Sequence, residues 1–202
     1  MESRDSQELP DLVRDTKLEA EIRGSFTVHT WPWKRQKREI WKRDPEPIGS
    51  GGYGLVWLER QVDHRLQPLG TRVRAVKQIR ATRPENMVRE CFRELEAVAK
   101  FSQDKYADHF VKSSGWFEGP GSLYLAMEFC ARGDLKAYVV SKGALPEAEA
   151  KIVTRQILIA LAHMHGEKFA HRDLKPAVGF FARRPFVSHL SVADHHFRRT
   201  FS

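Results

Sequence analysis

A glycine-rich segment in the first half of the chain has the spacing GxGxxG, which suits phosphate binding. The segment consists of Ile48, Gly49, Ser50, Gly51, Gly52, Tyr53, Gly54, Leu55 and Val56. Glycines let backbone N–H groups approach phosphate oxygens, because no side chain lies between them. Dinucleotide-binding folds use this spacing between a strand and a helix, but here a β-prone run, 55–62, follows. We therefore expect a turn between two strands that can fold over a phosphate chain, with a glycine-rich surface hairpin as the alternative.

Lys77 is a cation in a second β-prone run, 71–80, where it shares one strand face with Ala75. A cation among apolar strand residues needs an anion as a partner. Glu94 is the natural partner, because it lies on the apolar side of the helix expected at 84–101. Such an ion pair would hold Lys77 against the α- and β-phosphates of a nucleotide.

A third segment reads His171, Arg172, Asp173, Leu174, Lys175 and Pro176. Together with the glycine loop, the strand lysine and the helix glutamate, it follows the order that protein kinases share. The chain thus resembles the eukaryotic protein kinase family over about residues 44–176. Lys175, two residues after Asp173, resembles the serine/threonine branch rather than the tyrosine branch.

The resemblance implies a role for each candidate residue. Asp173 would accept or orient the proton of the substrate hydroxyl, with Lys175 near the transferring phosphate, and Lys77 and Glu94 would form the ion pair. The expected ATP-binding residues are Ile48, Gly49, Ser50, Gly51, Gly52, Tyr53, Gly54, Val56, Ala75, Lys77, Met127, Glu128, Cys130 and Asp134. Among these, Val56 and Ala75 would sandwich the adenine ring, Met127 would be the gatekeeper, the backbone of Glu128 and Cys130 would bond the adenine edge, and Asp134 would contact the ribose.

Two metal-binding positions depart from the family pattern. The family places an Asn five residues after the catalytic Asp, and that position is Val178 here, which has no oxygen for Mg²⁺. No DFG motif is present, and the nearest trace is Asp194 in Val192, Ala193, Asp194, His195 and His196, 21 residues after Asp173. We interpret this trace as a chance resemblance, or as the product of a shifted reading frame, rather than as a functional remnant. Mg²⁺ is expected for the family, but no metal ligand is predicted in this chain.

Composition bounds the class of protein. The chain has 202 residues, 41% of them hydrophobic, which suffices for a sizeable core. Two cysteines, Cys91 and Cys130, lie in apolar-periodic segments without a pairing pattern, so we expect buried thiols in a reducing compartment. No apolar run has the length of a membrane span, and residues 1–9 are acidic and polar, unlike a signal peptide. These features predict a cytoplasmic or nuclear protein.

The net charge is +8, and basic residues interleave with tryptophans over residues 31–43. They are Lys34, Arg35, Lys37, Arg38, Lys42 and Arg43, among Trp31, Trp33 and Trp41. Such a pattern can contact a phosphate backbone and stack on bases. We favour the interpretation of a solvated basic leader whose tryptophans dock on the next domain, so nucleic acid is not an expected partner.

Hydrophobic periodicity divides the chain into four regions. Residues 1–43 are predicted to be a flexible basic leader with at most a short helix near Leu12 to Ile22. Residues 44–130 are predicted to form a nucleotide-binding lobe of five antiparallel strands and one helix, and residues 131–176 the incomplete start of a helical lobe. Residues 177–202 have no period and are predicted to be a poorly ordered tail outside the family. The fold class is therefore α+β, with a two-lobe, protein-kinase-like arrangement.

The resemblance implies a serine/threonine protein kinase homologue that binds ATP. The family reaction transfers the γ-phosphate of ATP to Ser or Thr hydroxyls of a protein substrate. The departures at the metal positions, and a catalytic domain that we expect to be truncated or misread after Pro176, predict that this reaction is impaired here. The alternative is an inactive, pseudokinase-like module that binds nucleotide or acts as a scaffold.

Overall fold

The computed structural model describes residues 10–31, 37–51, 54–80, 87–181, 190–192 and 198–199. One antiparallel sheet dominates the first part of the chain, in the order β1-β2-β3-β5-β6-β8-β7, and β4 pairs with β5. Its strands are β1 Ala20–Arg23, β2 Phe26–Trp31, β3 Lys37–Arg43, β4 Gly49–Gly51, β5 Gly54–Val62, β6 Pro68–Arg80, β7 Ser113–Gly119 and β8 Ser122–Glu128. The five strands expected within residues 44–130 are β4 to β8.

Alternation along the strands explains why both faces of this sheet are buried. Helix α2, Met87–Phe101, covers one face, where its Cys91, Leu95 and Val98 pack against β-strand side chains such as Leu125. On the opposite face, Val76, Phe117, Tyr124 and Ala126 form a second cluster. Leu18, Ala20 and Ile22 from the N-terminal segment pack against that second cluster. The sheet therefore has a hydrophobic core on each face. Helix α2 shields one core from solvent, and the N-terminal segment packs on the other.

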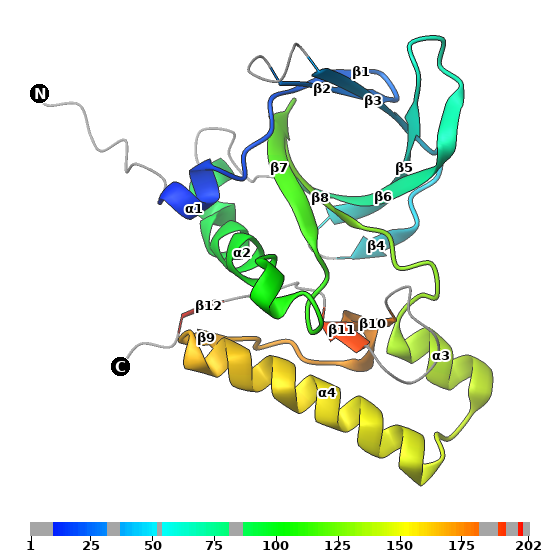
Figure 1. Ribbon diagram of the computed structural model, residues 1–202, viewed down its shortest axis with the longest axis vertical. Helices are drawn as coiled ribbons and strands as arrows, with labels where there is room; N and C mark the ends of the chain where they lie inside the picture. The colour runs from blue at the N-terminus through cyan, green and yellow to red at the C-terminus, as the bar shows by residue number, and fades with distance from the viewer. Residues whose placement is uncertain are drawn as a thin grey trace, which may run out of the picture.

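Residues 10–43 do not form the flexible leader that the sequence predicts. A short helix, α1 Asp11–Arg14, precedes the β1–β2 hairpin, and β3 pairs with β5. Figure 1 shows the sheet curling into an almost closed ring, in which β1 lies beside β7. The leader adopts this structure because its strands bury apolar and aromatic side chains against distant partners, among them Trp41 under the Arg74 guanidinium at 4.3 Å. Residues 1–9 and 32–36 of the predicted leader lie outside the described residues.

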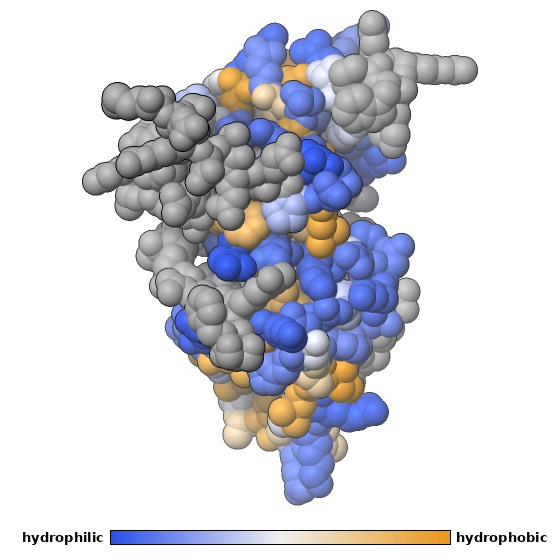
Figure 2. Space-filling view, turned by 90° about the vertical axis from the view of Figure 1, so that its left-hand side faces the viewer, coloured by the Kyte–Doolittle hydropathy of each residue, from blue (hydrophilic) through white to orange (hydrophobic). Residues whose placement is uncertain are grey.

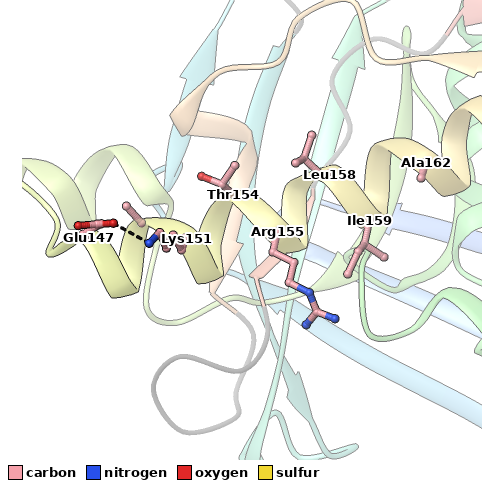
Figure 3. Close-up of a pocket in the computed structure, with 8 residues that line it drawn as sticks. Glu147, Lys151, Thr154, Arg155, Leu158, Ile159 and Ala162 are labelled. Atoms are coloured by element: carbon pink, nitrogen blue, oxygen red, sulfur yellow. Dashed lines mark ion pairs between the residues drawn. The ribbon is translucent and has the colours of Figure 1, made fainter.

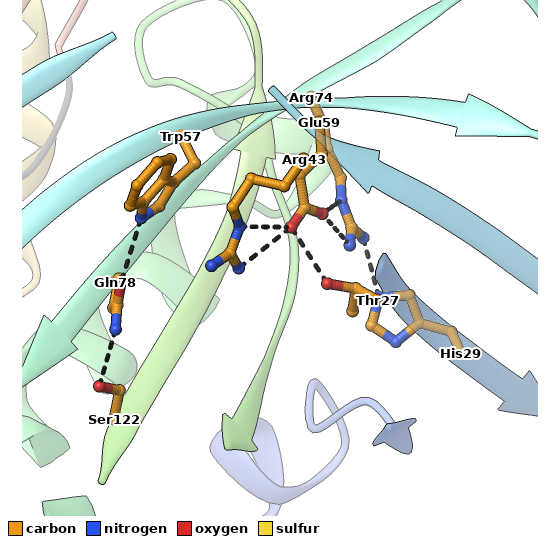
Figure 4. Close-up of polar contacts among 8 residues, drawn as sticks. All are labelled: Thr27, His29, Arg43, Trp57, Glu59, Arg74, Gln78 and Ser122. Atoms are coloured by element: carbon orange, nitrogen blue, oxygen red, sulfur yellow. Dashed lines mark hydrogen bonds and ion pairs between the residues drawn. The ribbon is translucent and has the colours of Figure 1, made fainter. Parts of the chain in front are cut away.

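A cluster of buried polar groups lies inside this ring (Figure 4). The fully buried Glu59 carboxylate accepts hydrogen bonds from Arg74 Nε at 2.9 Å and Nη2 at 2.6 Å. Arg43 Nη2 at 3.3 Å and Thr27 Oγ1 at 3.1 Å donate to the other carboxylate oxygen. Buried charges of opposite sign are thus paired and hydrogen-bonded, as a dry interior requires.

His29 in β2 joins this cluster as a neutral imidazole. The Arg74 guanidinium can only donate, so His29 Nε2, at 2.9 Å from Nη1, accepts, and the ring proton resides on Nδ1. That Nδ1–H donates to the carbonyl oxygen of Glu19 at 3.0 Å. Burial, together with the neighbouring Arg74 charge, lowers the pKa of His29 from 6.5 to about 4.

This shift predicts a pH-dependent stability. The unfolded chain binds a proton at His29 near pH 6.5, whereas the folded chain does not until about pH 4, so stability is lost as the pH falls through this window. We expect this group to contribute a slope of up to about 1.4 kcal/mol per pH unit to the free energy of unfolding. His29→Gln, which keeps an acceptor and a donor but does not titrate, should flatten that slope in urea unfolding measured from pH 6.5 to pH 4.5. Equal slopes for the two chains would contradict the assignment.

Residues 128–134, at the end of β8 and after it, are here called the hinge, and a helical region follows them. It contains α3, Leu135–Lys142, and α4, Glu147–Gly166. A third core cluster connects this region to α2, with Phe101 stacked on Phe110 and packed edge-on against Phe169, and with Met164 of α4 fully buried. Two apolar side chains of α4, Ile152 and Leu158, are exposed. Figure 2 shows hydrophobic side chains gathered toward the lower end of the molecule, where α3 and α4 lie.

The end of the chain contains regular structure that its composition does not predict. After β9, Phe169–Ala170, and the 3-10 helix η3, Pro176–Val178, strand β10, Gly179–Phe181, pairs with β11, Leu190–Val192. Strand β12, Arg198–Arg199, pairs with β9. Residues 182–189, 193–197 and 200–202 of the predicted tail lie outside the described residues. Within the described part of the chain, none of the helices combines the length and the apolar character needed to cross a membrane.

Candidate active site

Lys77 and Glu94 form an ion pair between the sheet and α2. Both side chains are sheltered from solvent, with 3% of Lys77 and 14% of Glu94 exposed. Lys77 lies in β6, between β5 and β8, and the alternation of this strand directs it to the same face as Ile79, against α2. The structure therefore brings together the cation and the anion that the sequence pattern paired. A buried lysine held in this way is a fixed positive charge.

The glycine-rich segment is the turn between β4 and β5. Gly49 pairs with Val56, Ser50 with Leu55, and Gly51 with Gly54. Gly54 has φ +128°, and a Cβ there would lie 1.9 Å from the carbonyl oxygen of Gln78, so only glycine fits this position. The Ile48 N–H donates to the carbonyl of Val56 at 2.8 Å, which continues the hairpin. Gly52 and Tyr53, at the tip, lie outside the described residues.

The strand registers place the expected adenine residues on neighbouring strands. Val56 in β5 pairs with Lys77, and Ala75 in β6 pairs with Met127 in β8. Met127 is partly buried and packs against the α2 core, which is compatible with a gatekeeper position. Residues paired directly across antiparallel strands share a face of the sheet, so these side chains lie on the face that α2 covers.

The hinge after β8 is fixed by hydrogen bonds at both ends. The Glu128 N–H donates to the carbonyl of Lys112, and its carboxylate accepts from the Lys112 N–H, both at 2.9 Å. The backbone carbonyl oxygen of Cys130 accepts a hydrogen bond from the Gly133 N–H at 3.0 Å. Asp134 is the N-cap of α3, where its carboxylate accepts from the Ala137 N–H at 2.7 Å. The predicted ribose contact thus also has a structural role that its sequence position alone does not reveal.

Among the candidate residues, Cys130 has a strongly shifted pKa. Burial, with a smaller effect of the Glu128 charge, raises the pKa of this thiol to about 12. The thiol therefore stays protonated at neutral pH. Because the thiolate is the nucleophile, Cys130 acts as a small apolar hinge residue and not as a reactive group.

The loop between β9 and η3 carries Asp173 and Lys175. Lys175 Nζ donates to Asp173 Oδ2 at 2.7 Å, and the Asp173 N–H donates to the carbonyl of the buried His171 at 2.8 Å. Arg172, between them, has φ +59°, a conformation that non-glycine residues adopt at a cost and that occurs often at functional sites. The structure thus holds the Asp173 carboxylate and the Lys175 ammonium group together on a constrained loop. In Figure 1 this loop runs along α4 on the side that faces the sheet.

The β10–β11 hairpin bears on the metal positions. Gly179 pairs with Val192 at one end of this hairpin. Val178 is the residue before Gly179 and supplies no oxygen, so this position does not fit Mg²⁺. Asp194, two residues after Val192, lies outside the described residues.

Other metal sites find no support in the part of the chain that the structure describes, where no group of three His, Cys, Asp or Glu residues could hold an ion. A groove of about 520 Å³ runs along α4 (Figure 3). Its lining residues are Glu147, Ala150, Lys151, Thr154, Arg155, Leu158, Ile159 and Ala162. None of them belongs to the candidate site.

Comparison with known proteins agrees with this geometry. The sequence model of the protein kinase domain matches residues 43–190. The chain belongs to the protein kinase family. The match extends past Pro176, where the sequence pattern placed the end of the resemblance, and includes β10 and the first residue of β11. It leaves α1, β1, β2 and all but the last residue of β3 outside the matched range.

The relatives of this kinase-family chain are serine/threonine kinases. It is 32% identical to maternal embryonic leucine zipper kinase from Danio rerio over 133 residues, which cover 65% of the chain and 18% of that protein. It is 30% identical to serine/threonine-protein kinase ATG1c from Arabidopsis thaliana over 154 residues, which cover 76% of the chain and 20% of that protein. The chain thus spans about a fifth of the length of these relatives.

A solved structure also matches the kinase fold. The crystal structure of Rad53 1-466 in complex with AMP-PNP aligns with a TM-score of 0.61 and 27% sequence identity. The alignment covers 76% of this chain and 38% of that one. The expected two-lobe kinase fold, with a sheet-rich small lobe, is confirmed.

Proposed function

We propose that this kinase-family chain binds ATP or ADP between the β4–β5 hairpin, β6 and the hinge after β8. The observation that carries the proposal is the buried ion pair between Lys77 and Glu94, which fixes a cation beside a glycine hairpin. The structural neighbour is in complex with AMP-PNP, which supports nucleotide binding by this fold. ATP is therefore the proposed ligand, and a Ser or Thr hydroxyl of a protein the proposed acceptor of the family reaction.

The residues of the site divide the work as follows. Lys77 binds phosphate oxygens of the nucleotide, and the Glu94 carboxylate keeps its ammonium group in place. Backbone N–H groups of the β4–β5 turn cover the phosphates. Gly54, which has no side chain, lets this hairpin lie close to the Gln78 carbonyl of β6. Asp173 orients the acceptor hydroxyl and takes its proton, while Lys175 exchanges its contact with Asp173 for one with the transferring phosphate.

Val178 makes this reaction inefficient in the proposed account. Phosphoryl transfer needs charge neutralisation that kinases obtain from metal ions, and Val178 cannot hold one. The second candidate function, a pseudokinase-like module that binds nucleotide without turnover, is favoured by this same residue. We place the protein in the cytoplasm or nucleus on the basis of its cysteine usage.

A phosphotransfer assay distinguishes the two candidates. With γ-labelled ATP and casein as a generic protein substrate, we expect the chain to incorporate no more label than its Asp173→Ala variant, because one metal position lacks an oxygen ligand. Incorporation well above background that Asp173→Ala abolishes would show an active kinase and would overturn the proposed impairment.

A further inference from the structure

We propose that residues 11–22, here called the α1 clamp, position α2 and thereby hold Glu94 against Lys77. This inference rests on the proposed nucleotide site, because its effect is exerted through that ion pair. The clamp lies outside the matched family domain, which begins at residue 43. It is therefore an addition to the kinase small lobe, and its contacts must be derived from this structure.

Val13 of α1 enters the same core as the side of α2 that carries Glu94. Its side chain is 0% exposed and clusters with Cys91, Leu95 and Val98 of α2. Cys91 and Leu95 lie three residues before Glu94 and one residue after it, so a shift of these two side chains moves the carboxylate as well. Figure 1 shows α1 lying against α2 beside β7. Val13 of the N-terminal segment therefore covers part of the buried side of α2.

Trp116 of β7 anchors the clamp to the sheet. Its indole N–H donates to the Val13 carbonyl at 2.8 Å, although the two residues are 103 positions apart. The backbone N–H of Trp116 donates to the carbonyl oxygen of Thr16 at 3.1 Å, and the Trp116 carbonyl oxygen accepts from the Leu18 N–H at 2.7 Å. Trp116 is 1% exposed, so these hydrogen bonds form in a nearly dry environment, where leaving them unmade is costly.

Two glycines in β7 make room for the clamp. Gly115 has φ +123°, and a Cβ there would lie 2.6 Å from the Thr16 carbonyl oxygen and 2.8 Å from Leu18 Cγ. A Cβ on Gly119 would lie 2.4 Å from Ile22 Cδ1. Because β7 carries glycine at both points of close approach, the strand is shaped to receive this segment rather than merely overlain by it.

The physical consequence is a link between the clamp and nucleotide affinity. If the contacts of Val13 with α2 are weakened, α2 gains freedom to move away from the sheet, and Lys77 loses the carboxylate that orients it. Val13 and Trp116 are therefore positioning residues, which act through Glu94 without touching the nucleotide. A residue with only a structural role would lower the melting temperature and leave nucleotide affinity unchanged.

A double-mutant cycle on the full chain tests this inference, with a fluorescent ADP analogue as the probe. Val13→Ala is compared with Val28→Ala, which removes the same methyl groups from a buried valine of β2. We expect Val13→Ala to weaken ADP binding about fivefold and Val28→Ala to leave it unchanged. In a Glu94→Gln background the effect of Val13→Ala should fall below about twofold, since the partner through which it acts is gone.

Trp116→Phe, which removes the indole N–H but keeps an aromatic ring, provides a second test if Val13→Ala folds poorly. Its matched control is Trp57→Phe, which also deletes one indole hydrogen bond, that from Trp57 to Gln78 at 3.0 Å. Equal affinities for each variant and its control would overturn the clamp, and so would a Val13→Ala effect that persists in the Glu94→Gln background. Absence of ADP binding in the unmodified chain would overturn the proposed function and the clamp together, and is distinguishable from both of these outcomes.

Discussion

Replacing Glu59 by Gln is expected to lower the free energy of unfolding by about 3–5 kcal/mol. The carboxylate is completely buried and pairs with two guanidinium groups, those of Arg74 and Arg43. Burial already lowers the pKa of Arg74, so the neighbouring carboxylate is what keeps a charged guanidinium tolerable inside the ring of strands. An amide at position 59 leaves that positive charge without compensation, and urea unfolding measures the loss.

The matched control is Glu21→Gln. Glu21 also pairs with an arginine, Arg23, at 2.6 Å, but on the surface of β1, where solvent screens the interaction. We expect no resolvable shift of its unfolding midpoint. If the Glu59→Gln chain were as stable as this control, the paired charges inside the ring would not stabilise the closed sheet. The claim that these charges hold the N-terminal strands in the ring would then be wrong.

Lys77→Ala is expected to weaken ATP binding about tenfold to a hundredfold, which corresponds to the loss of a charge-assisted hydrogen bond. The lysine ammonium group is held between β6 and Glu94 and is the fixed cation of the proposed phosphate site. Isothermal titration with ATP measures the effect. Lys151→Ala is the control, because Lys151 pairs with Glu147 on the exposed side of α4.

A Lys77→Ala chain that binds ATP as tightly as the unmodified one would place the nucleotide elsewhere on the molecule. Equal losses from Lys77→Ala and Lys151→Ala would point to nonspecific attraction of ATP by the net positive charge. Either result would contradict the assignment of the site.

The elements around the nucleotide site were predictable because their patterns are local. Strand alternation placed Ala75 and Lys77 on one face, and helical spacing placed Glu94 on the buried side of α2, so the ion pair followed from two short segments. The position of Gly54 was also readable from its spacing, since the turn between β4 and β5 needs a residue without a side chain there.

The N-terminal strands were not predictable in this way. Their burial depends on partners far along the chain, such as β3 on β5 and Val13 on Trp116, and no local period encodes such contacts. Glu59 and Arg74 also escaped prediction, because charged residues in a strand normally indicate an exposed face. The interleaved tryptophans of the leader carried part of the signal, since Trp41 does dock on the sheet beside Arg74.

The β10–β11 hairpin was missed for a different reason. Each of its strands has three residues, too few for alternation to be recognised against a background rich in phenylalanine and arginine. Val178, by contrast, was identified from its residue type alone as a position without an oxygen ligand for Mg²⁺, and the structure does not change that conclusion.

The most direct test of the account is the Mg²⁺ dependence of ATP binding. The central claim is that Lys77 and the glycine hairpin hold the nucleotide, while Val178 deprives the site of a metal ligand. Titrations in EDTA and in excess Mg²⁺ should therefore give dissociation constants within about threefold of each other, and Val178→Asn should widen that difference. Binding in the unmodified chain that is about tenfold or more tighter with Mg²⁺ would contradict the account.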